Sequence, residues 1–410
     1  MTSVDDRTID LLDGYLYVGD TDETYAWLRD HAPVYRDETN SIWGISRYDD
    51  VLDCERRTAR YSSAHGSRPN IDDSTSMINM DDPAHQQQRQ LVARQFTPRA
   101  VKQIEHRVRA VVTTLIDAVA EAGCCDVVHD LAAPLPAVLI GEKLGYPPEL
   151  WPRVIYWSET TMLSGGGPRY MATSAMKAVE DFAITTLGLI AERRRDPRDD
   201  LISLWCQKPV GDRLMTDAEI VSEALLLLDG GAETTRTVIG STVLALIEHP
   251  DQHKLLLDDP ALLADTAVEE FIRWVTPILN MRRTVTEDHE LHGRELRAGD
   301  QLLLMYAAAN RDPDAFEDPG RFDVTRRHNL HVAFGFGTHF CLGASLARLE
   351  IRVMFEELLR RIPDMRLAPW ADPRRQPSAF ACGLKDLRVE FTPVARSGDP
   401  AAFPTGQQGR

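Results

Sequence analysis

Hydrophobic residues recur along most of the chain with the three-to-four-residue spacing that is typical of amphipathic helices. This spacing predicts helices over residues 24–29, 83–96, 100–122, 173–195 and 217–249. Strand-like patterns are confined to short runs at 42–46, 283–285, 290–292, 301–305 and near 387–391. We therefore expect a mainly α-helical protein with small peripheral β-sheets.

The chain has 410 residues, 43% of them hydrophobic, and no interior linker divides it. We expect one domain over residues 1–394, followed by a disordered tail over 395–410, where Gly, Pro, Ser and Gln leave little to bury. No segment is apolar over the roughly 20 residues that span a bilayer, and the start of the chain does not resemble a signal peptide. These features predict a cytoplasmic protein without a transmembrane anchor.

Acidic residues outnumber basic ones by 63 to 46, which gives a formal charge of -17. This charge argues against binding to nucleic acids or anionic membranes. The six cysteines are too sparse for a disulfide framework, in agreement with a reducing compartment.

A glycine-rich loop delivers a single cysteine to the start of a predicted helix. Residues 331–343 read HVAFGFGTHFCLG, and a helical pattern follows over 344–356. The free N–H groups and positive dipole of a helix start favour the thiolate form of Cys341. Three interpretations compete: a small buried hydrophobic residue, a zinc ligand beside His328, His331 and His339, or a haem-thiolate ligand. The glycines count against the first, and the absence of a Cys-x-x-Cys pair counts against the second.

The same segment resembles the haem-binding signature of the cytochrome P450 superfamily at Phe334, Gly337, Cys341 and Gly343. The resemblance covers about residues 25–393, in the segment order of the bacterial soluble members. It implies the P450 fold, a triangular helical prism around a buried haem b, with Cys341 as the iron ligand. The other cofactor-binding residues that it implies are His85, Arg89, Arg283, Phe334, Gly335, His339 and Gly343.

The middle of the predicted helix 217–249 contains DGGAETT, at residues 229–235. Each Gly in a helix interior costs about 1 kcal/mol relative to Ala, so the pattern indicates either a tolerated kink or a close approach to another group. The stretch resembles the oxygen-activating segment of the P450 family. By that resemblance Thr234 would hydrogen-bond bound dioxygen, and Glu233 would relay protons from solvent.

Glu270 and Arg273 have a spacing that usually marks a solvated helix face. They also resemble the Glu-x-x-Arg pair of the P450 family, which implies a structural role. Gly165, Gly166 and Gly167 interrupt the helical pattern and predict either a mobile cover over a pocket or a plain surface loop.

A basic run lies within this acidic protein, either as a solvated helix face or, by the resemblance, as a docking patch for an acidic ferredoxin or flavodoxin that an NAD(P)H reductase supplies with electrons. Its residues are Arg89, Arg94, Arg99, Lys102, Arg107 and Arg109, extended by Arg348 and Arg352.

The resemblance also implies a largely apolar substrate pocket, which includes Leu226, Asp229, Ala232, Ile278, Leu279 and Phe380. Asp229 departs from the family pattern of an apolar residue before the paired glycines. We expect it to hydrogen-bond a polar group of the substrate or a partner elsewhere, because a buried unpaired carboxylate is costly.

The implied function is a haem-thiolate monooxygenase that hydroxylates a C–H bond of a sterol, steroid, branched lipid or terpenoid, with O2 and two electrons from a redoxin. Segments 80–85, 130–136 and 331–343 look like those of actinobacterial sterol and branched-lipid hydroxylases. The alternatives are a peroxide-driven peroxygenase of the same fold and a non-catalytic haem- or zinc-binding module.

Overall fold

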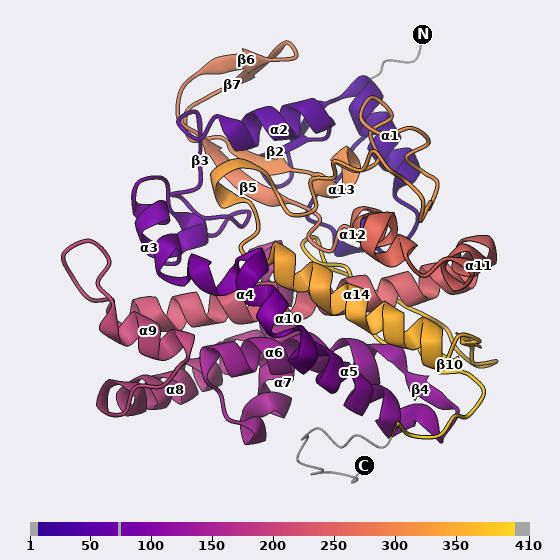
Figure 1. Ribbon diagram of the computed structural model, residues 1–410. Coiled ribbons are helices and arrows are strands. Elements are labelled where there is room, and N and C mark those ends of the chain that lie inside the picture. The colour runs from indigo at the N-terminus through magenta and orange to yellow at the C-terminus, as the bar shows by residue number, and fades with distance from the viewer. Residues whose placement is uncertain (1–6, 73–74, 398–410) are drawn as a thin grey trace.

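The protein is described by a computed structural model that covers residues 7–72 and 75–397 (Figure 1). The α-helices are α1 (Asp22–His31), α2 (Tyr48–Arg56), α3 (Ala84–Ala93), α4 (Pro98–Gln103), α5 (Glu105–Ala120), α6 (Pro134–Leu144), α7 (Trp151–Met162), α8 (Thr173–Arg195), α9 (Leu201–Gln207), α10 (Asp217–Glu248), α11 (Pro250–Asp258), α12 (Val268–Val275), α13 (Tyr306–Ala309) and α14 (Ala344–Arg361). The strands are β1 (Val34–Asp37), β2 (Ile42–Ile45), β3 (Tyr61–Ser62), β4 (Cys124–Asp126), β5 (Met281–Val285), β6 (His289–Leu291), β7 (Arg294–Leu296), β8 (Gln301–Leu304), β9 (Arg366–Leu367) and β10 (Arg388–Glu390). The predicted helical architecture with small sheets is confirmed.

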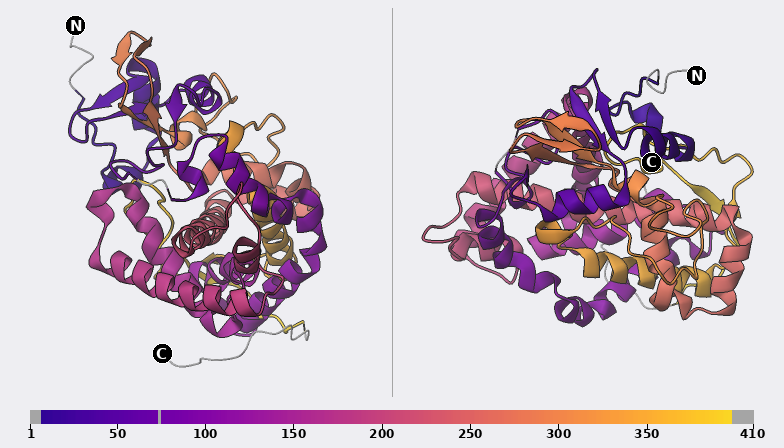
Figure 2. Two further views of the ribbon diagram at one scale, coloured as in Figure 1. Left: turned by 90° about the vertical axis from the view of Figure 1, so that its left-hand side faces the viewer. Right: turned by 90° about the horizontal axis from the view of Figure 1, so that it is seen from above.

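The main sheet has the strand order β1-β2-β8-β5-β3 and lies to one side of the helices, as the two further views show (Figure 2). Strand β2 pairs with β8 in parallel, and the other neighbours are antiparallel. Strands β4, β10 and β9 form a second sheet, and β6 and β7 form a hairpin. Each predicted strand run overlaps an observed strand. The strands that sequence reasoning missed have two to four residues, too few for a clear alternation.

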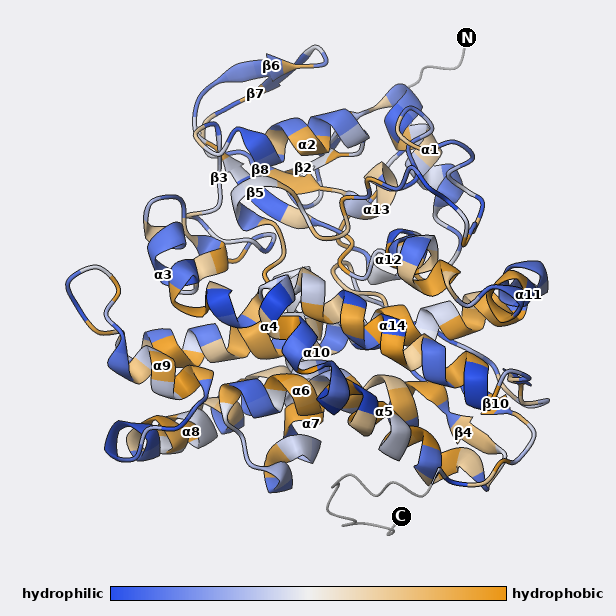
Figure 3. Ribbon diagram, viewed as in Figure 1, coloured by the Kyte–Doolittle hydropathy of each residue, from blue (hydrophilic) through white to orange (hydrophobic). Residues whose placement is uncertain are grey.

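The centre of the protein is α10, whose 32 residues make a helix about 48 Å long. Its start is fixed by a capping box, in which the backbone N–H of Thr216 donates to Glu219 Oε2 at 2.7 Å and that of Glu219 donates to Thr216 Oγ1 at 3.3 Å. Helices α6, α7, α12 and α14 pack around it. Hydrophobic residues are abundant along α6 and α10 (Figure 3). In the described ranges, no helix is both long and apolar enough to cross a bilayer.

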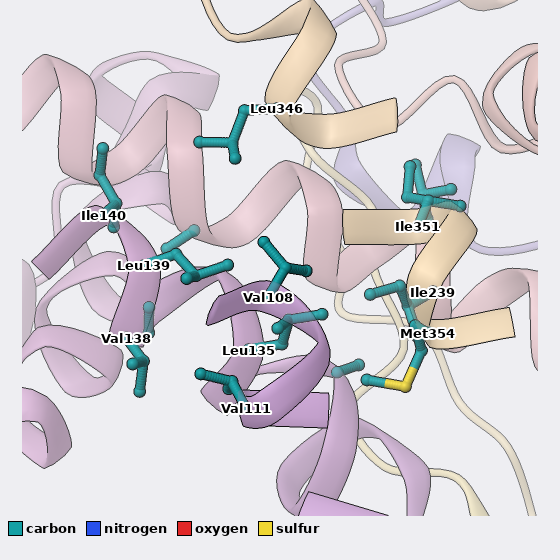
Figure 4. Close-up of a cluster of buried hydrophobic side chains, with 14 of the residues drawn as sticks. Val108, Val111, Leu135, Val138, Leu139, Ile140, Ile239, Leu346, Ile351 and Met354 are labelled. Atoms are coloured by element: carbon teal, nitrogen blue, oxygen red, sulfur yellow. The ribbon is translucent and has the colours of Figure 1, made fainter. Parts of the chain in front are cut away.

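The largest hydrophobic core includes side chains from most of the helices, and Figure 4 shows part of it, between α5, α6, α10 and α14. Val108 of α5, Leu135 of α6, Ile239 of α10 and Met354 of α14 are each fully buried. Burying one such side chain contributes about 1.5–3 kcal/mol to stability. The core therefore fixes α14 relative to α10, and α14 begins three residues after Cys341.

Two predicted segments differ from the structure. The single helix predicted over 100–122 is two helices that meet at Ile104, whose φ of -98° and ψ of 5° interrupt the helical path. Helix α4 starts at Pro98 because Thr97 accepts a hydrogen bond from the N–H of Ala100. The glycine segment forms a short 3-10 helix, Leu163–Gly166, whose glycines are buried. A Cβ on Gly165 would lie 2.5 Å from the Phe380 ring, so this segment is packed and not a plain surface loop.

Most of the predicted tail lies outside the described residues, but the backbone N–H of Ser397 donates to Asp117.

Glu270 and Arg273 form a fully buried ion pair at the centre of a larger network, not a solvated face. Arg273 Nε and Nη2 each donate to Glu270 at 2.8 Å, and Arg273 Nη1 donates to the carbonyl oxygens of Asn310 and Pro319. Arg326 also donates to Glu270, at 3.1 Å. The pair therefore joins α12 to the long connection that leads to the Cys341 loop.

We predict that Arg273→Ala lowers the free energy of unfolding by about 3–5 kcal/mol, because it leaves a buried carboxylate and several carbonyl groups without their main partner. Denaturant titration measures this change. The matched control is Lys254→Ala, which breaks the exposed ion pair between Lys254 and Asp258 and should change stability little. Equal small effects of both substitutions would contradict the structural role of the buried pair.

Candidate active site

The Cys341 loop is held in a fixed shape by its backbone. The N–H of Cys341 donates to the carbonyl oxygen of Phe334 at 2.9 Å, which closes the loop. Gly335 and Gly337 have φ values of 66° and 69°, a region that disfavours other residues. A Cβ on Gly337 would also lie 2.8 Å from the carbonyl oxygen of Glu55. The glycines of the motif are therefore required by the path of the chain and by its contact with α2.

Burial raises the pKa of the Cys341 thiol, although the N–H groups of Gly343 and Ala344 and the charges of Arg89 and Arg348 act in the opposite direction. The N–H groups at the helix start favour the thiolate, as expected, but desolvation outweighs them. A bound cation at the sulfur would reverse the balance, since a coordinating thiol is deprotonated. The environment thus suits a metal ligand better than a free nucleophile.

Cys341 lines a cavity in the protein, and α10 bounds the same cavity through Gly230, Gly231 and Thr234. A Cβ added to Gly230 would meet no atom within 4 Å, whereas one added to Gly231 would lie 3.1 Å from Ile140. Gly231 therefore allows close packing of α6, and Gly230 keeps space open beside the cavity. Helix α10 continues through both glycines, and the Thr234 hydroxyl donates to the carbonyl oxygen of Gly230 at 2.8 Å.

Glu233, the second predicted catalytic residue, is not among the described residues that line this cavity. Arg236 Nη1 donates to Glu233 at 2.9 Å and also contacts Glu159 at 2.7 Å. Burial raises the pKa of Glu233, and Arg236 partly offsets this effect. Thr234 therefore faces the cavity in this conformation, while Glu233 is engaged with Arg236.

The predicted propionate-binding residues His85, Arg89, Arg283 and His339 all line the cavity. The rings of His85 and His339 lie 4.2 Å apart. His339 Nε2 is buried without a hydrogen-bond partner in the described part of the chain, and a buried polar atom of this kind indicates a missing partner. A carboxylate of haem would supply one, so these residues fit haem propionates. Phe334, Gly335 and Gly343, the remaining predicted cofactor-binding residues, line the cavity as well.

Sequence reasoning missed three polar residues of the cavity wall: Glu55, Tyr306 and Glu350. Arg283 Nη2 donates to Glu55 Oε2 at 2.6 Å, and the Tyr306 hydroxyl donates to Glu55 Oε1. Burial raises the pKa of Glu350 to about 8. No local signal marks Glu55 or Tyr306, because they meet Arg283 only in the fold. Glu350 carried a weak signal, as an acid among apolar residues of α14.

Three of the six predicted substrate-pocket residues line the cavity, namely Leu226, Asp229 and Ile278. The other three are not among its lining residues: Ala232, Leu279 and Phe380. Ala232 belongs to the large core around α10, and Leu279 packs in a separate cluster near the N-terminal segment. Phe380 lies behind Arg68, whose guanidinium carbon is 3.7 Å from the centroid of the ring. A sequence position near the pocket therefore did not decide which way these side chains point.

The residues of the zinc interpretation are dispersed. His331 Nε2 lies 3.2 Å from Glu269, His339 stacks on His85, and His328 is exposed. Among the residues that the structure describes, no group of three or more His, Cys, Asp or Glu side chains could hold a metal ion. A single sulfur beside this cavity would instead suit an iron that is held by the nitrogens of a porphyrin.

Comparisons with known proteins agree with this site. The sequence profile of the family described as cytochrome P450 matches residues 262–365. The chain is 44% identical to a steroid C26-monooxygenase of Mycobacterium tuberculosis, over 94% of this chain and 97% of that protein. It is 38% identical to a methyl-branched lipid omega-hydroxylase of Mycobacterium bovis, over 90% and 91% of the two chains.

Solved structures give the same result. CYP109E1 from Bacillus megaterium, in complex with testosterone, has a TM-score of 0.84 and 34% identity, and the match covers 90% of this chain and 97% of that one. CYP268A2 of Mycobacterium marinum, in complex with pseudoionone, has a TM-score of 0.86 and 31% identity over 94% of this chain and all of that one. The chain therefore belongs to the cytochrome P450 superfamily and is a haem-thiolate monooxygenase that uses O2 and electrons from a redox partner.

Proposed function

We propose that this monooxygenase hydroxylates a sterol, steroid or branched lipid at an unactivated C–H bond. The observation that carries the proposal is the shared cavity, which places Cys341 and Thr234 among mostly apolar side chains. The apolar residues Met77, Met162, Leu226, Ile278 and Met281 would position such a molecule by shape and burial. The names of the relatives in Mycobacterium support the same substrate class.

Cys341 would bind the haem iron, and His85, Arg89, Arg283 and His339 would bind the propionates. Haem, when bound, supplies the activation of O2 and the oxidation of the C–H bond. The chain contributes position and protons. The Thr234 hydroxyl would donate a hydrogen bond into the cavity in place of its bond to Gly230, and Glu233 would pass protons inward after release from Arg236.

The test of the haem-thiolate assignment is the carbon monoxide difference spectrum of the reduced holoprotein. We expect the red-shifted Soret band from which the family takes its name. Cys341→Ala should lose that band, because no other sulfur replaces Cys341 at the iron. The buried Cys206, changed to Ala, is the matched control and should retain it. Retention of the band by Cys341→Ala, or its absence from freshly prepared wild-type protein, would refute the assignment.

The role of Thr234 is tested by coupling. Thr234→Ala should keep the haem spectrum but divert at least about 90% of the reducing equivalents to peroxide, since a positioned proton donor contributes roughly 10²–10⁴-fold to the productive step. Ser241→Ala, which removes a buried hydroxyl elsewhere on α10, should remain coupled. Product and peroxide yields per NADH measure the effect. If the two variants are equally coupled, Thr234 does not deliver protons.

Faster turnover of the wild type with peroxide than with a redoxin would favour the peroxygenase alternative.

We further propose a ferredoxin or flavodoxin as electron donor, docking on α4 beside the Cys341 side of the protein. Helix α4 packs against α14, which begins just after the Cys341 loop. Five members of the predicted basic patch are engaged elsewhere: Arg107, Arg109, Arg348 and Arg352 in ion pairs with Glu side chains, and Arg89 in a hydrogen bond to Phe340. Arg94, Arg99 and Lys102 are exposed and form no ion pair with a described residue.

We also propose that this electron transfer takes place in a reducing compartment such as the cytoplasm, because the described cysteines are free.

Reversal of one charge tests this surface. Lys102→Glu should slow reduction by an acidic ferredoxin roughly tenfold at low salt, and the difference from wild type should shrink as salt screens the surface. Lys385→Glu, an exposed lysine on the connection before β10, should have no such effect. Stopped-flow reduction of the holoprotein measures both. An equal change in the two variants would show that only net charge matters and would refute the proposed patch.

A further inference from the structure

Two charged side chains face the otherwise apolar part of the cavity. Arg68 comes from the connection after β3, and Asp229 comes from α10. Both side chains retain some solvent-accessible surface. Burial nevertheless lowers the pKa of Arg68 to about 10 and raises the pKa of Asp229 to about 7. Their remaining accessible surface therefore faces the cavity and not bulk solvent.

Arg68 has few partners for a buried guanidinium. Nη1 contacts Met281 Sδ at 2.8 Å and the carbonyl oxygen of Ser67 at 3.4 Å. Its Nε and Nη2 donate to no residue in the described ranges, and Arg68 forms no ion pair there. The Phe380 ring holds the guanidinium plane at 3.7 Å. Arg68 is therefore an oriented donor with unused N–H groups.

Asp229 is the complementary acceptor. Its Oδ1 lies 2.6 Å from the Thr161 hydroxyl, which fixes the carboxyl group against α7. Its Oδ2 makes no hydrogen bond within the described part of the chain. Arg68 and Asp229 influence each other electrostatically without contact, because each shifts the pKa of the other. The charges of the two groups nearly cancel. Arg68 retains unused N–H donors, and Asp229 retains Oδ2 as an unused acceptor.

We propose that Arg68 and Asp229 together bind a hydroxyl group of the substrate. This inference rests on the proposed function and names the polar group that the lipophilic substrate must carry. A hydroxyl can accept from a guanidinium and donate to a carboxylate at the same time. A ketone or ether only accepts, and a carboxylate ligand would add a second negative charge beside Asp229. The pair thus selects a neutral alcohol over ligands of similar shape.

The test uses flexible chains with one polar end, because these can place that end anywhere in the cavity. Dodecan-1-ol, its methyl ether and dodecanoate are titrated into the holoprotein, and the Soret shift gives each Kd. The measurement is made at about pH 8, where a carboxyl group with a pKa of about 7 is mostly ionised. We expect the alcohol to bind at least about tenfold more tightly than the ether, the size of a hydrogen bond to a charged group, and more tightly than dodecanoate.

The double variant Arg68→Leu/Asp229→Leu should bring the Kd values of alcohol and ether to within about twofold, because an apolar wall no longer distinguishes them. It leaves no single buried charge behind, so it is the variant least prone to misfold, and its carbon monoxide spectrum checks haem binding. The matched control is Leu226→Ala on the same helix, which should shift the Kd values of all three probes by a similar factor.

Each other outcome separates the two proposals. If wild-type protein binds none of the probes, the proposed lipophilic substrate is wrong. If it binds alcohol and ether equally, or dodecanoate most tightly, the hydroxyl site is wrong while the proposed function stands. If the double variant loses haem and weakens all probes alike, the pair supports the cofactor and the hydroxyl site is again refuted.

Discussion

Burial of the Cys341 sulfur against the cavity wall disfavours the negative charge that a haem iron requires of its ligand. The N–H groups of Gly343 and Ala344 and two arginines reduce this penalty without cancelling it. A bound cation would therefore supply the stabilisation that the thiolate still lacks, so that ligand and metal would depend on each other. Glycine is required at position 337 because a side chain there would prevent the Cys341 loop from passing so close to α2.

Buried ion pairs fix the segments that surround the candidate active site. The network of Glu270, Arg273 and Arg326 fixes the connection that enters the Cys341 loop, while Glu55 ties α2 to Arg283 of β5 and to Tyr306. Removal of these charges from water is unfavourable, and several hydrogen bonds to each carboxylate offset it. Hydrophobic packing places α10 opposite α14, and these polar networks then set the loops between the helices.

The sequence predicted most of the helices and the cysteine motif, but it did not predict much of the cavity wall. The start of α10 follows from a capping box, and the extent of α8 and α10 follows from a hydrophobic periodicity that is local in the chain. The pairing of Glu55 with Arg283 joins residues more than two hundred positions apart, and no local pattern encodes it. The loop that carries Arg68 has no periodicity, so the sequence does not show which of its side chains face the cavity. The direction in which Leu279 and Phe380 point depends on tertiary packing in the same way.

The Cys341 sulfur would bind the iron of the haem. X-ray absorption spectroscopy at the iron edge of the purified holoprotein detects this bond, because sulfur scatters differently from nitrogen and oxygen. We expect a single sulfur neighbour in addition to four porphyrin nitrogens. A first shell that contains only nitrogen and oxygen would refute the assignment of Cys341 as the ligand.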